Sequence, residues 1–203
     1  MFKRLVTATA FSILSLTAAQ ATTITSVNTT GSAVPVNLND SLILPTGAAW
    51  DVSGTPASVT GSASGLYLSP IDDGAAGGLD ETTSYWNLTG GNTGIMDFTG
   101  THTSLSFLWG SVDTYNAVEF WLNGNVVATI ISAMLVPAPT PGTSGGASFV
   151  TVAGLTFDEV HFTTTGNSFE FMGVSAAVPL PAGGLLLIGA IGGLAALRRR
   201  KAV

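Results

Sequence analysis

Alternating apolar and polar residues dominate the middle of the chain, with the period of two that indicates half-buried β-strands. The segment SLSFLWG at 104–110 has a large apolar side chain at every second position, and NAVEFWL at 116–122 repeats the pattern. Asn123-Gly124 follows directly and suits the positive φ angles of a two-residue turn. The apolar residues 126–131 then return, so the pattern predicts an antiparallel hairpin at 116–131.

Two further segments near the C-terminal side, LTFDEVHF at 155–162 and SFEFMGV at 168–174, also read as strands. Helical periodicity is scarce, and turn residues separate the short strands, which is typical of an antiparallel β-sandwich, here expected to be jelly-roll-like. The Pro/Gly/Ser-rich residues 136–148 and the acidic residues 72–81 are expected to be loops within one domain, 22–177. Simple alternation in the first segment predicts one face with Leu155, Phe157, Glu159 and His161 and an opposite face with Thr156, Asp158, Val160 and Phe162.

Charge is strictly segregated along the chain. Its six Lys and Arg residues all lie at the two ends, whereas its twelve Asp and Glu residues lie between Asp40 and Glu170. No side chain in the middle can neutralise a phosphate, so nucleic-acid binding is not expected. The absence of cysteine excludes a disulfide framework, a thiolate metal site and a cysteine nucleophile.

The first 21 residues have the three parts of a secretory signal peptide. Lys3 and Arg4 precede a modest apolar stretch, and Ala19 and Ala21 supply the small side chains that signal peptidase requires, so we expect cleavage after Ala21. An N-terminal anchor helix is the alternative, but the apolar run is short and rich in Thr and Ser.

The C-terminal residues predict a membrane-spanning helix and a stop signal. Residues 180–197 carry no charge and would span about 27 Å as a helix, which is just enough for a hydrocarbon core. The basic cluster at 198–201 would hold the end of the chain in the cytoplasm and leave the acidic domain outside. The stop-transfer residues are Arg198, Arg199, Arg200 and Lys201.

Residues 178–203 resemble a known bacterial sorting signal. The order Val178, Pro179, Leu180, Pro181, Ala182, followed by a glycine-rich apolar run and terminal arginines, is similar to the VPLPA-CTERM variant of the PEP-CTERM signals. That resemblance implies recognition by an exosortase, a membrane transpeptidase of Gram-negative bacteria, with cleavage near the prolines and delivery to the cell surface or exopolysaccharide matrix. A permanent uncut anchor and a rhomboid-type tail at Gly183-Gly184 are the alternatives.

The middle of the chain is also similar to a group of exosortase-dependent surface proteins with an F-x-W-G-S-x-D-x-Y-N pattern. This resemblance implies a surface sandwich domain without an assigned activity. The residues that carry it are Phe107, Trp109, Gly110, Ser111, Asp113, Tyr115, Asn116, Phe157, Asp158, Phe169, Glu170 and Phe171.

Signals for catalysis are weak. His102 and His161 have no G-x-S-x-G elbow beside them, and the adjacent pair Asp158-Glu159 would point to opposite faces of a strand, which makes it a poor acid/base pair. A glycine-rich loop offers hard oxygen ligands for calcium, although the regular spacing of a calcium loop is missing. Its carboxylates are Asp72, Asp73, Asp80 and Glu81.

Exposed aromatic side chains would suit a glycan. Trp86, Trp109, Tyr115 and Trp121 are the candidates, and most aromatics on alternating strands are core residues. Trp121 shares a strand face with Ala117 and Glu119, so it is the one expected to be exposed. We therefore expect an exported, non-enzymatic surface module with a structural, adhesive or glycan-associated role, and the alternative is a secreted carbohydrate-active enzyme with the same sorting tail.

Overall fold

The computed structural model describes residues 22–28, 42–70, 82–135 and 147–178, and every strand pairing in it is antiparallel. The prediction of an all-β antiparallel domain is therefore confirmed. The strands are β1 (Thr23–Asn28), β2 (Ala48–Trp50), β3 (Ala57–Val59), β4 (Tyr85–Leu88), β5 (Thr93–Gly110), β6 (Asn116–Leu122), β7 (Asn125–Ile131), β8 (Ser148–Thr164) and β9 (Phe169–Ala177), and a short 3₁₀ helix, η2, covers Ser132–Met134.

The helices expected at 1–21 and 180–197 lie outside the described residues. Among the residues that are described, none belongs to a helix long and apolar enough to cross a bilayer.

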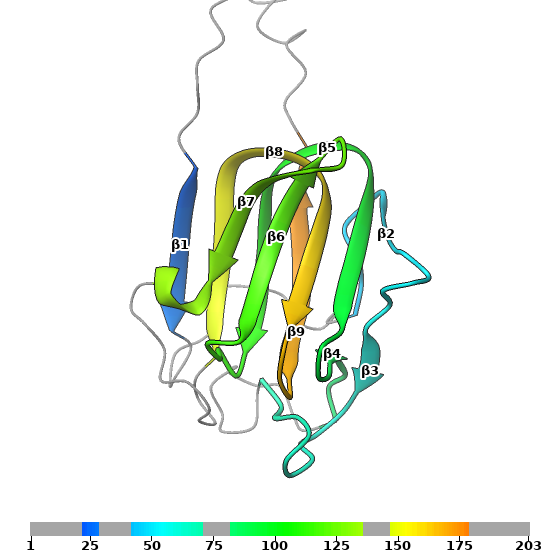
Figure 1. Cartoon of the computed structure of the whole chain (residues 1–203), viewed down its shortest axis with the longest axis vertical. Coiled ribbons are helices and arrows are strands. Elements are labelled where there is room, and N and C mark those ends of the chain that lie inside the picture. The colour runs from blue at the N-terminus through cyan, green and yellow to red at the C-terminus, as the bar shows by residue number, and fades with distance from the viewer. Residues whose placement is uncertain (1–21, 29–41, 71–81, 136–146, 179–203) are drawn as a thin grey trace, which may run out of the picture.

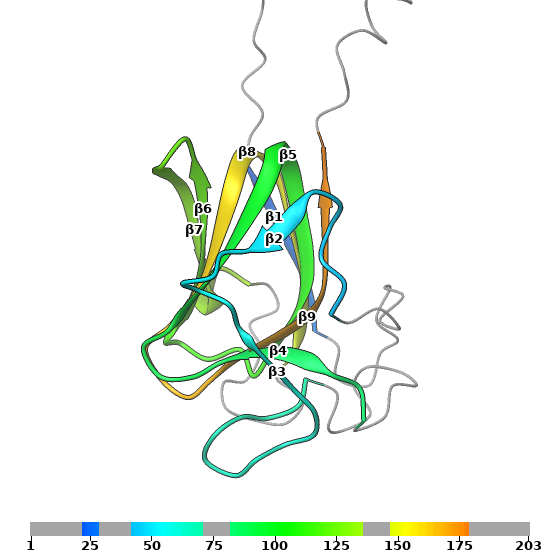
Figure 2. The same ribbon diagram turned by 90° about the vertical axis from the view of Figure 1, so that its right-hand side faces the viewer.

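Two long strands, β5 and β8, create the layered shape because each contributes to both layers. The first half of β5 and the second half of β8 pair with each other and continue into β2 on one side and β6 and β7 on the other. The second half of β5 and the first half of β8 pair with each other in the other layer. There β1 pairs with β8, and β9, β4 and β3 follow one another on the β5 side. Figures 1 and 2 show both strands arching over at one end, so that the sheet faces itself across a core.

The bend in β5 lies where its pairing with β8 is irregular. The register shifts between Asp97 and His102 and again between His102 and Ser104. Gly100, between these points, has φ +86°, which glycine adopts without steric cost. Irregular pairing of this kind bends a strand sharply and allows one strand to serve two layers.

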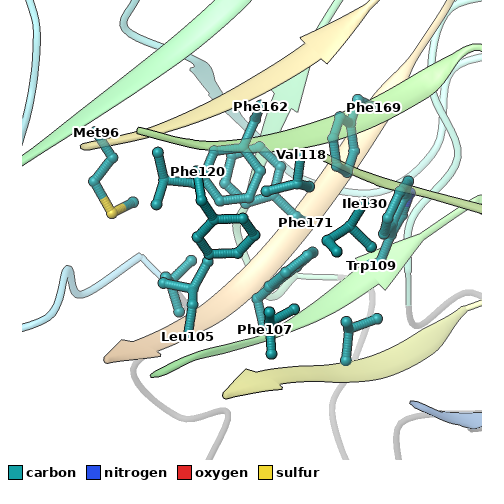
Figure 3. Close-up of a cluster of buried hydrophobic side chains, with 14 of the residues drawn as sticks. Met96, Leu105, Phe107, Trp109, Val118, Phe120, Ile130, Phe162, Phe169 and Phe171 are labelled. Atoms are coloured by element: carbon teal, nitrogen blue, oxygen red, sulfur yellow. The ribbon is translucent and has the colours of Figure 1, made fainter. Parts of the chain in front are cut away.

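The core fills the space between the layers with aromatic side chains (Figure 3). Leu105, Phe107 and Trp109 are all fully buried, as the alternation predicts. Phe107 on one layer meets Phe162 on the other with ring centroids 5.5 Å apart, and Phe162 stacks on Phe171 at 4.1 Å. These contacts make the burial of aromatic surface the main force that holds the layers together.

The predicted faces of residues 155–162 are wrong in their second half. Leu155 and Phe157 are buried, but the next buried side chains are Val160 and Phe162, while Glu159 and His161 are only partly buried on the opposite side. The alternation changes parity at Asp158-Glu159 because β8 bends there from one layer to the other. A period-two extrapolation cannot detect an irregularity of one residue.

The described chain starts and ends at the same end of the two layers. Thr23 pairs with Ala153, Ala153 with Ser104, and Ser104 with Ala177, so β1 begins and β9 ends on one row of the sheet. The pair Gly110 and Glu170 lies six residues further along β5, about 20 Å away at the rise of a strand. Figure 1 shows this second end below, next to β3 and β4.

Candidate functional site

The end of the domain opposite the two described chain ends contains a cavity of about 240 Å³. Three segments that are far apart in sequence surround it: the turn at 62–68, the segment after β5 and the segment that leads into β9. The last two are the two halves of the surface-protein resemblance. The lining consists of residues 62–68 together with Ser111, Asp113, Tyr115, Asn167, Ser168 and Glu170. We call this the motif cavity.

Hydrogen bonds from Tyr115 and Asn116 join the two halves of the motif. The Tyr115 hydroxyl lies 2.7 Å from Asp113 Oδ2 and 2.5 Å from the carbonyl oxygen of Asn167, and these two acceptors share its single proton. Asn116 donates from Nδ2 to the carbonyl oxygen of Ser168 at 2.9 Å. Residues of the F-x-W-G-S-x-D-x-Y-N pattern therefore hold the segment before β9 in place and build the cavity wall.

Glycine is required where the wall comes close to neighbouring chain. A Cβ on Gly110 would lie 2.6 Å from Cγ of Pro70 and 3.2 Å from Cβ of Glu170. Real Cβ atoms do not approach other atoms as closely as the first of these distances, so a side chain at Gly110 would push the wall of the cavity apart.

The third wall is a turn whose ends are tied to the sheet. Ala63 and Tyr67 form a bridge, and the Tyr85 hydroxyl donates to the carbonyl oxygen of Gly61 at 2.5 Å. Tyr67 packs edge-on against the buried Tyr85, with ring centroids 6.4 Å apart. The turn thus presents one half-buried tyrosine ring to the cavity from a fixed position.

Glu170 is the most unusual group in the motif cavity because it is an acidic side chain that is only 1% exposed. Its Oε1 accepts hydrogen bonds from the backbone N–H of Leu68 at 2.9 Å and from the Ser168 hydroxyl. Its Oε2 has no hydrogen-bond partner within the described part of the chain.

Burial raises the pKa of Glu170 from its ordinary value of 4.5 to about 7, and the nearby charge of Asp113 contributes in the same direction. Interactions with the Ser168 hydroxyl, the backbone of Leu68 and the backbone of Glu170 itself oppose the shift. About half of these carboxyl groups are therefore neutral at neutral pH.

A second acidic group, Asp113, lines the same cavity and is 8% exposed. Burial raises the pKa of its partner Tyr115 well above the usual range, and the hydrogen bond to the Asp113 carboxylate adds to this. Tyr115 thus remains a neutral donor at any physiological pH. The cavity combines two carboxyl groups, hydroxyl groups and a tyrosine ring, and the middle of the chain has no Lys or Arg to balance them.

Trp121 lies in a different place, on the outer face of β6. Its ring stacks on His161 of β8 with centroids 4.7 Å apart, and its Nε1 donates to Glu119 Oε2 at 3.2 Å. His161 in turn contacts Glu159 through Nε2. These four residues form what we call the outer-face patch. Trp121 is half-buried, and each of the four side chains has a partner within the patch.

The remaining candidates, Trp86, Trp109 and His102, pack against other side chains of the domain. Trp109 is fully buried, and Trp86 is half-buried and packs edge-on against Trp50. His102 is buried beside Phe98 at the bend of β5. These contacts fit the expectation that most of the aromatic side chains serve packing.

The prediction that Asp158 and Glu159 point to opposite faces of the strand is wrong, because both lie outside the core between the buried Phe157 and Val160. Asp158 accepts from the backbone N–H of Asn123 at 3.1 Å, next to the predicted turn, where Asn123 and Gly124 have φ angles of +51° and +74°. The hairpin turn predicted from Asn123-Gly124 is confirmed.

Several predicted sites lie outside the described residues. They comprise the calcium candidates, the signal-cleavage residues, the sorting motif after Val178 and the stop-transfer cluster, namely Asp72, Asp73, Asp80, Glu81, Ala19, Ala21, Pro179, Leu180, Pro181, Ala182, Arg198, Arg199, Arg200 and Lys201. Within the described ranges, no three metal-ligating side chains gather into a group that could hold an ion.

Sequence reasoning did not identify the motif cavity. Tyr115 is the one cavity residue that the sequence singles out for chemistry, as an aromatic glycan candidate. Ser111, Asp113 and Glu170 enter only through the resemblance, and Asn167, Ser168 and the turn at 62–68 carry no functional signal. The available clue was a charged residue between two phenylalanines in FEF at 169–171, since an acidic residue within an apolar strand indicates a special environment. Comparison of the chain with protein-family models, with curated proteins and with solved structures found no match.

Proposed function

We propose that the chain is an exported bacterial surface protein, released by signal peptidase and sorted through its C-terminal tail by an exosortase-type transpeptidase. The domain that it presents at the cell surface or in the exopolysaccharide matrix is a jelly-roll-like β-sandwich that associates with glycans and does not catalyse a reaction. No cofactor is required for this role, and the acidic residues Asp72, Asp73, Asp80 and Glu81 are the candidates for a bound calcium ion.

One observation carries this proposal: the two ends of the described chain and the motif cavity lie at opposite ends of the domain. A tail that holds the domain at a membrane from the Ala177 end would direct the motif cavity about 20 Å outward, away from that membrane. The segregation of positive charge to both ends of the chain supports the same orientation, because basic clusters remain on the cytoplasmic side.

Intact-mass measurement and C-terminal sequencing of the mature protein from its native host test the sorting. Sorting predicts an N-terminus at Thr22 and a C-terminus within residues 178–182. A mature chain that still ends in the basic cluster 198–201 would instead indicate a permanent anchor. A full-length chain in the cytosol with its leader attached would contradict the whole proposal.

The outer-face patch supports the glycan-associated role. A tryptophan ring held in place by His161 and flanked by the carboxylates of Glu119 and Glu159 offers a flat apolar surface beside hydrogen-bond acceptors, the combination that a sugar ring requires. A glycan array probed with the full chain should give a signal that Trp121→Ala abolishes. If no glycan on the array gives a signal, the domain has a structural role and the glycan association is contradicted.

A secreted carbohydrate-active enzyme is the second candidate, and one observation favours it: Asp113 and Glu170 line the same cavity. Glycoside hydrolysis needs a protonated acid and a second carboxylate, and the raised pKa of Glu170 suits the first role. We rank it second because Glu170 Oε1 is already occupied by two hydrogen bonds within the protein. Release of reducing sugar from a polysaccharide by the full chain, lost in Glu170→Gln, would reverse this order.

A further inference from the structure

The motif cavity has a buried carboxylate in its wall, which a second cavity of similar volume lacks. The other cavity, of about 250 Å³, lies beside residues 53–57 and 87–93; it also has a buried oxygen without a partner among the described residues, Asn87 Oδ1, but no carboxylate lines it. The motif cavity contains Glu170, which is 1% exposed and keeps Oε2 without a partner among the described residues. An unpaired buried carboxylate oxygen costs free energy, so its presence in a cavity wall points to a ligand that completes it.

The charge of the cavity restricts the chemistry of that ligand. Asp113 and Glu170 supply negative charge, and residues 22–178 contain no Lys or Arg, so an anion would be repelled. Among the described residues, no three metal-ligating side chains gather here or elsewhere, so the cavity lacks the ligand set that a divalent cation needs. A hydroxyl group both donates and accepts, and it can therefore pair with either form of Glu170.

The size and the remaining lining favour one ring bearing several hydroxyl groups. The volume of 240 Å³ corresponds to about eight water molecules, far more than a bare ion fills and close to what one hexose displaces. Tyr67 supplies a fixed aromatic ring against which an apolar sugar face can pack, and Ser111 and Ser168 add hydroxyl groups.

We infer that the motif cavity binds one uncharged sugar residue, with Glu170 and Asp113 as hydrogen-bond acceptors and Tyr67 as the stacking ring. This site is separate from the outer-face patch, and its choice of ligand class rests on the proposed glycan association. A strand of polysaccharide with one residue in the cavity would be held at the end of the domain farthest from Ala177.

Saturation-transfer NMR tests the inference on the full chain in a zwitterionic detergent, which has no sugar head group to compete. The probes are the methyl glycosides of glucose, galactose, mannose, rhamnose and N-acetylglucosamine, with calcium chloride as a separate probe. We expect at least one glycoside to bind with a Kd on the order of 1 mM, and both Glu170→Ala and Tyr67→Ala to weaken it at least tenfold. Asp51→Asn, which removes an exposed charge outside the cavity, should bind as the parent does.

Tyr67→Ala is included because it leaves Glu170 and its hydrogen bonds intact, and thermal unfolding of each variant shows whether it has folded. Three results would overturn the inference: no glycoside binds, binding is unchanged in both variants, or calcium binds through Glu170 and glycosides do not. Binding lost in Trp121→Ala but retained in the two cavity variants would also overturn it, while leaving the glycan association through the outer-face patch intact.

Discussion

The motif cavity and the outer-face patch are built from the same kinds of side chain, namely carboxylates beside aromatic rings, but their surroundings differ. In the patch, Glu119, Glu159, Trp121 and His161 are only partly buried, and each has a partner in the group. In the cavity, Glu170 is buried, and half of its carboxylate has no partner in the described structure. Burial, rather than residue type, raises the pKa of Glu170 and decides which region is costly to disturb.

The difference has a physical cause in the position of each region on the sheet. The patch lies on the outer face of paired strands, where water screens its charges and solvates unpaired atoms. The cavity lies at the end of the layers, where the turn at 62–68 covers Glu170 on one side and donates a backbone hydrogen bond to it. Substitutions of matched chemistry should therefore have larger effects in the cavity than in the patch.

The largest expected effect is that of Glu170→Gln on the pH dependence of stability. Because folding raises the pKa of Glu170 from 4.5 to about 7, the folded protein binds more protons than the unfolded chain in this range. The free energy of unfolding therefore falls as pH rises through this window, by about 3 kcal/mol in total. Glu170→Gln has no carboxyl group to titrate and lacks this loss. Its free energy of unfolding should therefore equal that of the parent at pH 4.5 and exceed it at pH 8.

Chemical denaturation of both proteins at several pH values measures this difference. His102, whose pKa is lowered by burial, titrates nearby with the opposite sign, but it is present in both proteins and cancels in the comparison. Parallel pH profiles of the parent and Glu170→Gln would show that Glu170 is not buried in the folded protein.

Gly110→Ala should be the next most damaging change. The new methyl group would meet the Pro70 ring at 2.6 Å, and we expect a loss of about 2 kcal/mol, or a Tm lower by about 4–8 °C. Gly124→Ala, in the hairpin turn next to the patch, is the comparison. A Cβ at Gly124 would meet nothing within 4 Å, and the only source of strain is its φ of +74°. That variant should lose about 1 kcal/mol. Equal losses would remove the distinction between a packed and an open region.

Two substitutions that each remove a hydrogen-bond donor from an aromatic side chain compare the two regions directly. Tyr115→Phe removes the hydroxyl that lies between Asp113 and Asn167, and it should cost about 1–2 kcal/mol because a buried acceptor loses its donor. Trp121→Phe removes the N–H that bonds Glu119 at the surface, and it should cost about 0.5 kcal/mol or less. Urea unfolding midpoints measure both, and a larger cost at Trp121 would reverse our ranking.

The smallest expected effect concerns the charge of the whole domain. Twelve carboxylates without Lys or Arg among them repel one another, so added sodium chloride or millimolar calcium should stabilise the protein by about 1 kcal/mol or less, which is about 2–4 °C in Tm. Thermal scans across both titrations measure this. A melting temperature that does not change in either titration would contradict it.

Local pattern was sufficient for the strands at 104–110, 116–122, 126–131, 155–162 and 168–174 and for the turn that joins β6 and β7, but β1 to β4 and the first half of β5 were not predicted. Period-two alternation and Asn123-Gly124 are properties of neighbouring residues, and the structure has the hairpin where they predict it. The expected exposure of Trp121 is not found, because its ring stacks on His161 and is half-buried, like Trp86 and Tyr115. The segregation of charge, and the sorting function that we propose from it, depend on the sequence alone.

Only the tertiary structure decided where the bends fall and which distant residues meet. The parity change at Asp158-Glu159 depends on β8 crossing between layers, and no local signal records that crossing. The motif cavity needs the turn at 62–68, Asp113 and Glu170 to be brought together from three parts of the chain. The sequence determined the residue types, but burial and pairing across long distances, which set the acidity of Glu170, exist only once the chain has folded.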